Sequence, residues 1–120
     1  MEGGLPFLVL LLNLYVGLSA ASTFKVGGDA GWALNVDMQA WADSQRFYPG
    51  DVLEFDYNKE AHDVVEVTEE GFERCTAEDA IATFRSGADR IALQTESTRY
   101  FICSVPGHCP AGMKVRIQTV

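Results

Sequence analysis

The chain has 120 residues, and its 17 acidic residues outnumber its 9 basic residues, which gives a net charge of −8. An acidic chain of this kind lacks the basic patch needed to bind nucleic acid or an anionic membrane surface. Its length is that of one domain with a single modest core.

The N-terminal segment is typical of a secretory signal peptide. An apolar run extends from Leu5 to Leu18, and small residues follow it at positions 19–22. This order matches the hydrophobic region and cleavage site of a signal peptide, although Glu2 stands where a basic residue is usual. The run is short for a membrane span. A buried N-terminal helix is the alternative interpretation.

We therefore predict a cleaved signal peptide over residues 1–21 and one secreted, extracellular domain over residues 22–120. No other apolar stretch is long enough for a transmembrane helix, and the C-terminal residues show no hydrophobic tail of the kind that directs a lipid anchor. We expect no nucleic-acid partner and a monomeric protein.

The pattern of residues 22–120 predicts short strands separated by turns. Residues 52–57 alternate apolar and acidic side chains, and residues 114–120 alternate again with Val115 and Ile117 inward. Asp37 can cap a short helix over residues 38–42, and a helical turn is expected over residues 69–75. Further strands are expected over residues 23–26, 63–68, 90–94 and 99–103, with turns at residues 49–51 and 86–89. Six to eight such strands indicate an all-β antiparallel sandwich or barrel.

Most aromatic side chains are expected in the core of this sandwich, and the acidic residues on its surface. The densest acidic cluster comprises Glu66, Glu69, Glu70 and Glu73. We interpret it as a solvated face. The expected core aromatics are Phe47, Phe55, Tyr57, Phe72, Phe84, Tyr100 and Phe101.

The segment from Cys103 to Met113 carries the most informative chemistry. It holds a thiol (Cys103), an imidazole (His108) and a thioether (Met113), and His62 is the only other histidine in the chain. Two histidines, one cysteine and a weak axial methionine are the ligand set of a blue-copper electron-transfer site. The sequence therefore predicts one type 1 copper ion bound by these four residues.

The cysteine count is consistent with a metal thiolate. Three cysteines leave one unpaired thiol in a secreted protein. If Cys103 binds the metal, Cys75 and Cys109 remain for a disulfide. A Cys103–Cys109 bridge would remove the soft ligand. A Cys75–Cys103 bridge would leave Cys109 as the ligand, but its position next to His108 makes it hard for both side chains to reach one metal.

The expected sandwich can bring the four ligands together. Cys103 ends one expected strand and Lys114 begins the next, so the loop between them can fold over a metal at one end of the barrel. His62 would reach the same end from the start of a neighbouring strand. Pro106, Gly107, Pro110 and Gly112 tighten or stiffen the loop.

The chain resembles the phytocyanins, which are plant blue-copper proteins of the cupredoxin fold. The resemblance runs from residue 24 to residue 120, and the matching stretches are residues 26–29, 31–32, 41–42, 47–51, 53–57, 62–67, Cys75 and 100–113. The resemblance implies a Greek-key β-sandwich or barrel of about 7–8 strands with one or two short helical segments. It also implies copper ligation by His62, Cys103, His108 and Met113, and a Cys75–Cys109 disulfide.

Within that family, early nodulin-like members lack ligands, whereas all four positions are filled here. Methionine at position 113 disfavours the stellacyanin branch, so the chain is plantacyanin-like or uclacyanin-like. The expected function is a one-electron carrier of the apoplast or cell wall, not an enzyme, with an unknown small-molecule or protein redox partner. The alternative is a non-redox extracellular binding or signalling protein with a structural copper site.

Overall fold

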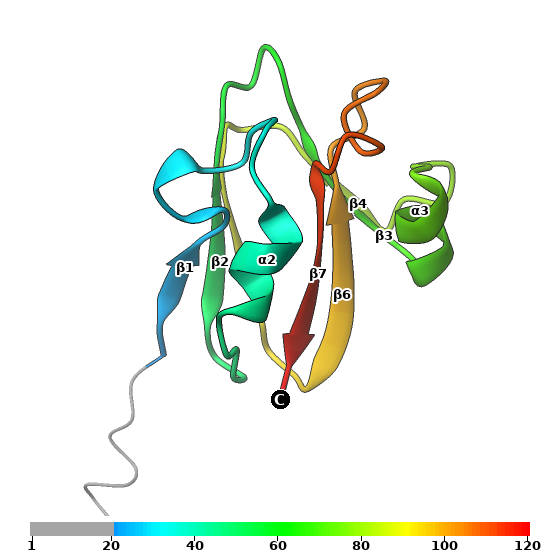
Figure 1. The fold of residues 1–120 in the computed structure, drawn as a ribbon. Coiled ribbons are helices and arrows are strands. Elements are labelled where there is room, and N and C mark those ends of the chain that lie inside the picture. Colours follow the sequence, from blue (N-terminus) through cyan, green and yellow to red (C-terminus); the bar gives the residue numbers. More distant parts are fainter. Residues whose placement is uncertain (1–20) are drawn as a thin grey trace, which may run out of the picture.

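The computed structural model describes residues 21–120, so the predicted signal peptide lies outside the described residues except for Ala21. Two sheets pack face to face, with the chain crossing between them (Figure 1). One sheet has three strands in the order β1 (Thr23–Lys25), β2 (Val52–Asp56) and β5 (Ala88–Ala92). The other has four strands in the order β4 (Ala82–Phe84), β3 (Val64–Val67), β6 (Ser97–Ile102) and β7 (Lys114–Thr119).

This architecture confirms the all-β sandwich with two short helices. One strand pair departs from the antiparallel expectation, because β1 runs parallel to β2. An isolated parallel bridge between Phe47 and Thr119 connects the segment before β2 to β7, so the two sheets are linked at this side. Among the described residues, no helix has the length and apolar character needed to cross a membrane.

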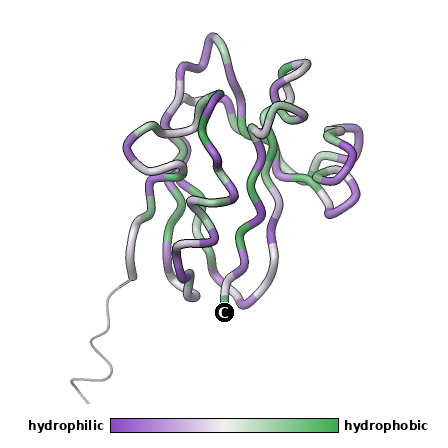
Figure 2. The backbone as a smooth tube through the Cα atoms, viewed as in Figure 1, coloured by the Kyte–Doolittle hydropathy of each residue, from purple (hydrophilic) through white to green (hydrophobic). Residues whose placement is uncertain are grey.

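The core lies between the two sheets and follows the predicted alternation. Leu53 and Phe55 of β2 are fully buried, as are Val115 and Ile117 of β7. The alternation of hydrophobic and hydrophilic segments along these strands is visible in Figure 2. Burial of one such side chain stabilises a fold by about 1.5–3 kcal/mol, so these two strands fix which faces of the sheets meet.

Two short helices and one 3-10 turn (η1, Gly28–Ala30) complete the fold. Helix α2 (Met38–Asp43) begins where predicted, because the Asp37 carboxylate accepts a hydrogen bond from the Ala40 N–H. Helix α3 (Glu69–Arg74) begins at Thr68, whose hydroxyl accepts from the Gly71 N–H. It ends at Cys75, which adopts a left-handed conformation at φ 55° and turns the chain away from the helix axis.

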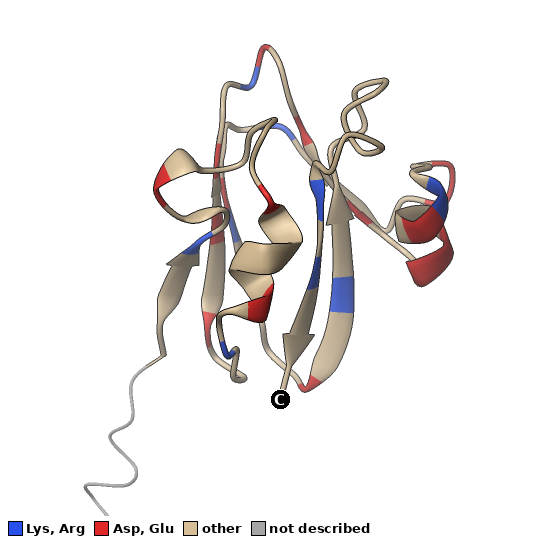
Figure 3. Ribbon diagram, viewed as in Figure 1, with Lys and Arg blue, Asp and Glu red and all other residues tan. Residues whose placement is uncertain are grey.

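The interpretation of the acidic cluster as one solvated face is wrong for Glu66. The acidic residues of α3, whose positions are red in Figure 3, are exposed, but Glu66 lies on β3 and is only 8% exposed. Both of its carboxylate oxygens accept hydrogen bonds from Arg99 on β6, each at 2.8 Å. Arg99 also donates to the Ala92 carbonyl of β5 at 2.9 Å and therefore bridges the two sheets.

The predicted turn over residues 86–89 is also too long, because β5 begins at Ala88. Asp89 is buried and accepts hydrogen bonds from the Tyr57 hydroxyl and from Ser86. Burial and the bond to Asp89 together raise the pKa of Tyr57 to about 12. A polar residue that looks like a turn former thus serves as a buried acceptor at the start of a strand.

Candidate metal centre

Strand pairing brings the predicted ligands to one end of the sandwich. Strands β3 and β6 are antiparallel, with Val65 opposite Ile102, so the start of β3 lies beside the end of β6. His62 precedes β3 and Cys103 follows β6. The loop over residues 104–113 (the metal loop) projects from this end of the sandwich and carries His108 (Figure 1).

Three predicted ligand atoms approach each other closely. Nδ1 of His62 lies 3.1 Å from Nδ1 of His108. The Cys103 sulfur lies 3.8 Å from the His62 nitrogen and 3.5 Å from the His108 nitrogen. Within residues 21–120, this is the only group of three or more histidine, cysteine or acidic side chains with metal-binding proximity.

These separations fit one metal ion at the centre of the three atoms. Metal–nitrogen bonds are about 2.0–2.1 Å long and metal–sulfur bonds about 2.3 Å long for a borderline ion such as Zn²⁺. With such bonds, the observed separations correspond to angles of roughly 100–125° at the ion. That is close to the trigonal His₂Cys arrangement of blue-copper sites.

The fourth predicted ligand, Met113, is buried at 1% exposure and packs in the same core cluster as Cys103. Its backbone is tied to two other ligand residues. The Cys103 N–H donates to the Met113 carbonyl at 3.0 Å, and the Met113 N–H donates to the His108 carbonyl at 3.0 Å. The metal loop is therefore closed at its base by the residues that are proposed to bind the ion.

Further hydrogen bonds within the metal loop hold His108 in place. Its N–H donates to the Val105 carbonyl at 3.0 Å, and its carbonyl also accepts from the Ala111 N–H at 3.1 Å. The Gly112 N–H donates to Cys109 at 2.9 Å. Gly107 and Gly112 have φ values of 85° and 106°, which favour glycine, so the loop can turn tightly at both points.

Asp63 connects the histidine segment to the cysteine segment, and sequence reasoning had assigned it no role. Its buried carboxylate accepts hydrogen bonds from the Ser104 N–H at 2.7 Å and from the Ser104 hydroxyl. Its carbonyl accepts from the indole of Trp32 at 2.8 Å. Because Asp63 follows His62 and Ser104 follows Cys103, these bonds fix the spacing of two predicted ligands without any metal.

The sequence signal for this connection is an acid directly before a valine-rich strand, β3. Residues 64–67 are all buried, and Asp63 is 6% exposed directly before them. A buried carboxylate needs hydrogen-bond donors to offset its desolvation. That requirement predicts a partner nearby, but it does not identify Ser104.

Burial shifts the pKa values of two predicted ligands in opposite directions, and in both cases it favours the uncharged form. The desolvated ring of His62, repelled further by His108, has a pKa below its usual value, so the imidazole stays neutral and free to bind metal at lower pH. Burial raises the pKa of the Cys103 thiol, although the backbone N–H groups of Asp63 and Val105 oppose this shift. A bound cation would reverse the effect on the thiol, because coordination deprotonates it.

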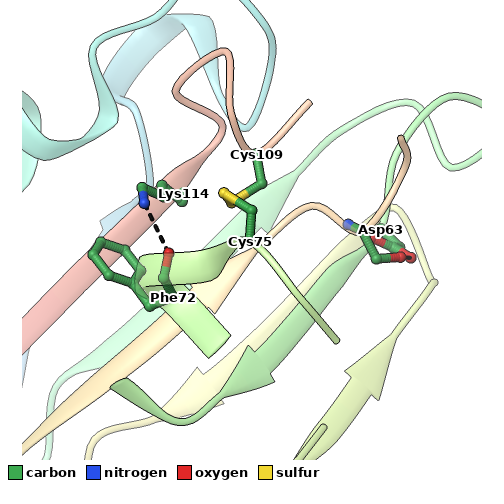
Figure 4. Close-up of a disulfide and its surroundings, with 6 residues drawn as sticks. Asp63, Phe72, Cys75, Cys109 and Lys114 are labelled. Atoms are coloured by element: carbon green, nitrogen blue, oxygen red, sulfur yellow. Dashed lines mark hydrogen bonds between the residues drawn. A yellow bond between two sulfur atoms is a disulfide. The ribbon is translucent and has the colours of Figure 1, made fainter. Parts of the chain in front are cut away.

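The disulfide lies beside the metal loop and joins it to α3 (Figure 4). Cys75 and Cys109 are bonded, with 5.6 Å between their Cα atoms, and Cys103 is the free, buried cysteine. On the neighbouring side, Lys114 donates a hydrogen bond to the Phe72 carbonyl at 2.8 Å. The disulfide thus fixes Cys109 to the end of α3, while the ring of the adjacent His108 lies against the other predicted ligands, His62 and Cys103.

Comparison with known proteins adds independent information. A family model described as a plastocyanin-like domain matches residues 32–113. The chain is 40% identical over 114 residues to a blue copper protein of Pisum sativum. The matching region covers 95% of this chain but only 60% of that protein. It is 41% identical over 114 residues to a chemocyanin of Lilium longiflorum, covering 95% of this chain and 86% of the relative.

A solved structure shares the fold. The cucumber basic protein, described as a blue copper protein, superposes with a TM-score of 0.74 at 39% sequence identity, over 82% of this chain and 99% of that one.

Proposed function

The chain belongs to the phytocyanin family of plant blue-copper proteins, and from this premise we propose that it is a type 1 copper protein that carries single electrons by cycling between Cu(II) and Cu(I). The observation that carries the proposal is the convergence of the His62, Cys103 and His108 ligand atoms at one point, with separations of 3.1, 3.5 and 3.8 Å.

Each ligand residue has a distinct role in this proposal. His62, Cys103 and His108 supply the strong ligands in one plane, and Met113 supplies a weak axial thioether. Copper, when bound, supplies the one-electron redox chemistry. The protein contributes a fixed arrangement, because the Asp63–Ser104 bonds and the closed metal loop hold three of the ligand segments in place. A site that moves little between oxidation states needs little reorganisation for electron transfer.

The exposed parts of the site indicate where a partner would approach. His62 and His108 are half-buried, whereas Cys103 and Met113 are buried. With both Nδ1 atoms facing the ion, the far edges of the two imidazole rings offer the shortest route to the surface. The partner, a small molecule or a protein, would exchange electrons there, and no substrate would be turned over. Two histidines are too few to build the additional copper centres of a copper oxidase.

We extend the proposal to the processing and location of the chain. Residues 1–21 are removed as a signal peptide, and residues 22–120 form the extracellular copper-binding domain. The Cys75–Cys109 disulfide supports this location, because disulfides form and persist in oxidising compartments.

Copper titration of the purified protein followed by redox cycling tests the proposed function. One equivalent of Cu(II) is expected to produce an intense blue band from thiolate-to-copper charge transfer, and the band should bleach and return reversibly on reduction and reoxidation. A protein that binds copper but is not reduced reversibly would instead support a structural copper site. Absence of the blue band would contradict type 1 ligation.

Replacement of the proposed axial ligand should shift the reduction potential. Met113→Gln places an oxygen donor near the metal, which favours Cu(II), so the potential should fall; Met113→Leu removes the donor and should raise it. Each tenfold change in the relative affinity for the two oxidation states moves a one-electron potential by about 59 mV. Voltammetry of both variants measures the shift. Unchanged potentials in both would show that Met113 is not the axial ligand.

A further inference from the structure

A second feature lies beside the metal loop and plays no part in ligation. A groove of about 570 Å³ runs between the segment before α2, strand β7 and the end of the metal loop. Its apolar walls come from Val36, Phe72 and Ala111, and two cations, Lys114 and Arg116, face it from β7. The two basic positions of β7 appear beside α2 in Figure 3. None of the four proposed copper ligands lines this groove.

The first cation is held in a fixed position. Lys114 Nζ donates a hydrogen bond to the Phe72 carbonyl at 2.8 Å and lies 4.3 Å from the centre of the Phe72 ring. An ammonium group has three N–H donors, so two remain for a ligand. The ring of Phe72 is itself supported by Tyr100, with 5.2 Å between the ring centres.

The second cation, Arg116, is exposed, and no acid among residues 21–120 forms an ion pair with it. Within residues 21–120, the structure pairs neither Arg116 nor Lys114 with a carboxylate; its ion pairs involve Arg74, Arg90 and Arg99. Asp37 is the one acid among the described residues that line the groove, so the two cations outnumber it and the charged lining residues carry a net positive charge, which favours an anion in a chain of net charge −8.

Two of the remaining polar side chains of the groove, Gln39 and Asp37, are already engaged in hydrogen bonds. The Gln39 side chain donates to the Arg116 carbonyl at 3.2 Å and accepts from the Arg116 N–H at 2.9 Å, which ties α2 to β7. The Asp37 carboxylate accepts from the Ala40 N–H at 2.9 Å as the helix cap. The groups free to bind a ligand are therefore the two cations, the exposed Asn35 side chain and the apolar walls.

We propose that this groove binds a small aromatic carboxylate. Its volume lies in the range of small-molecule sites, which combine apolar walls with a few polar groups that fix orientation. The carboxylate would bind Arg116 and Lys114 through charge-assisted hydrogen bonds, and the ring would contact Val36 and Phe72. This site is separate from the proposed electron-transfer function and does not require copper.

Titration with 2-naphthoate tests the groove directly. We expect saturable changes in the ¹⁵N–¹H NMR spectrum at Gln39, Ala111, Lys114 and Arg116, in both the Cu(I)-loaded and the metal-free protein, with a dissociation constant on the order of 1 mM. Arg116→Gln should weaken binding about tenfold, because a charge-assisted hydrogen bond is lost. Arg85→Gln, an exposed arginine outside the groove, is the matched control with the same change in net charge and should bind as the parent does.

Two further ligands separate the contributions of charge and ring. The neutral 2-naphthamide and the ringless acetate should each bind at least about tenfold more weakly than 2-naphthoate, as the loss of one anchoring interaction predicts. Equal binding of 2-naphthamide would overturn the proposed role of the cations. Spectral changes centred outside the groove, or equal affinity of the Arg116→Gln and Arg85→Gln variants, would overturn the site. Thermal unfolding of each variant checks that the fold is intact.

Discussion

Replacing Cys103 by serine is expected to abolish the blue absorption band and to lower copper affinity strongly. The blue colour requires a thiolate bound to Cu(II), and serine offers a hard, protonated oxygen in place of that soft ligand. Cys103 is fully buried, and its sulfur lies within 3.8 Å of both histidine nitrogens, so no other thiol can take its place without a change of fold. Absorption spectroscopy and equilibrium copper competition measure the two effects.

This variant also separates ligation from folding. Serine is close to cysteine in volume, and the disulfide does not involve residue 103. Circular dichroism of Cys103→Ser should therefore match that of the metal-free parent. A variant that stayed blue would show that Cys109 is the thiolate ligand and that the disulfide pairing is different in the copper-loaded protein.

Removal of the disulfide is expected to cause the largest loss of stability. The Cys75–Cys109 bond joins residues 34 positions apart, and closing a loop of this length stabilises the folded state by about 3–4 kcal/mol in the chain-entropy model. For a domain of this size, that corresponds to a fall in Tm of roughly 15–25 °C. Calorimetric unfolding of the Cys75→Ala/Cys109→Ala variant and of the parent, both in the metal-free state, measures this loss of stability.

The same variant should release copper more readily than the parent. Cys109 is adjacent to His108, so loss of the bond frees one side of the metal loop from α3. Copper retention against a chelator should fall, whereas the blue band of the loaded variant should remain because Cys103 is untouched. Peptide mapping of the oxidised, metal-free parent is the control: a disulfide that included Cys103 would contradict the assignment.

Much of this architecture could be predicted because its signals are local. The alternation of residues 52–57 and 114–120 predicts β2 and β7 to within a residue or two, and the Asp37 cap predicts the start of α2. The ligand set could be proposed because three unusual donors occur within eleven residues and only one other histidine exists. These inferences require no knowledge of which strands pair.

The elements that could not be predicted depend on contacts between distant segments. Strand β4 is only three residues long, which is too short for its alternation to predict a strand, and its residues 82–84 pair with β3. Glu66 looks like a member of an acidic surface until Arg99, 33 positions away, is placed against it. The same holds for Asp63, whose partner Ser104 is 41 positions away. In each case the polar or short segment is explained only by its partner.

The fixed metal loop also bears on how such a site persists over evolution. Its backbone hydrogen bonds, the Asp63–Ser104 contacts and the disulfide all form without using a ligand atom of His62, Cys103 or His108. The fold would therefore tolerate replacement of these three side chains by others that lack a metal-binding atom. Selection for stability alone does not maintain the three donor atoms.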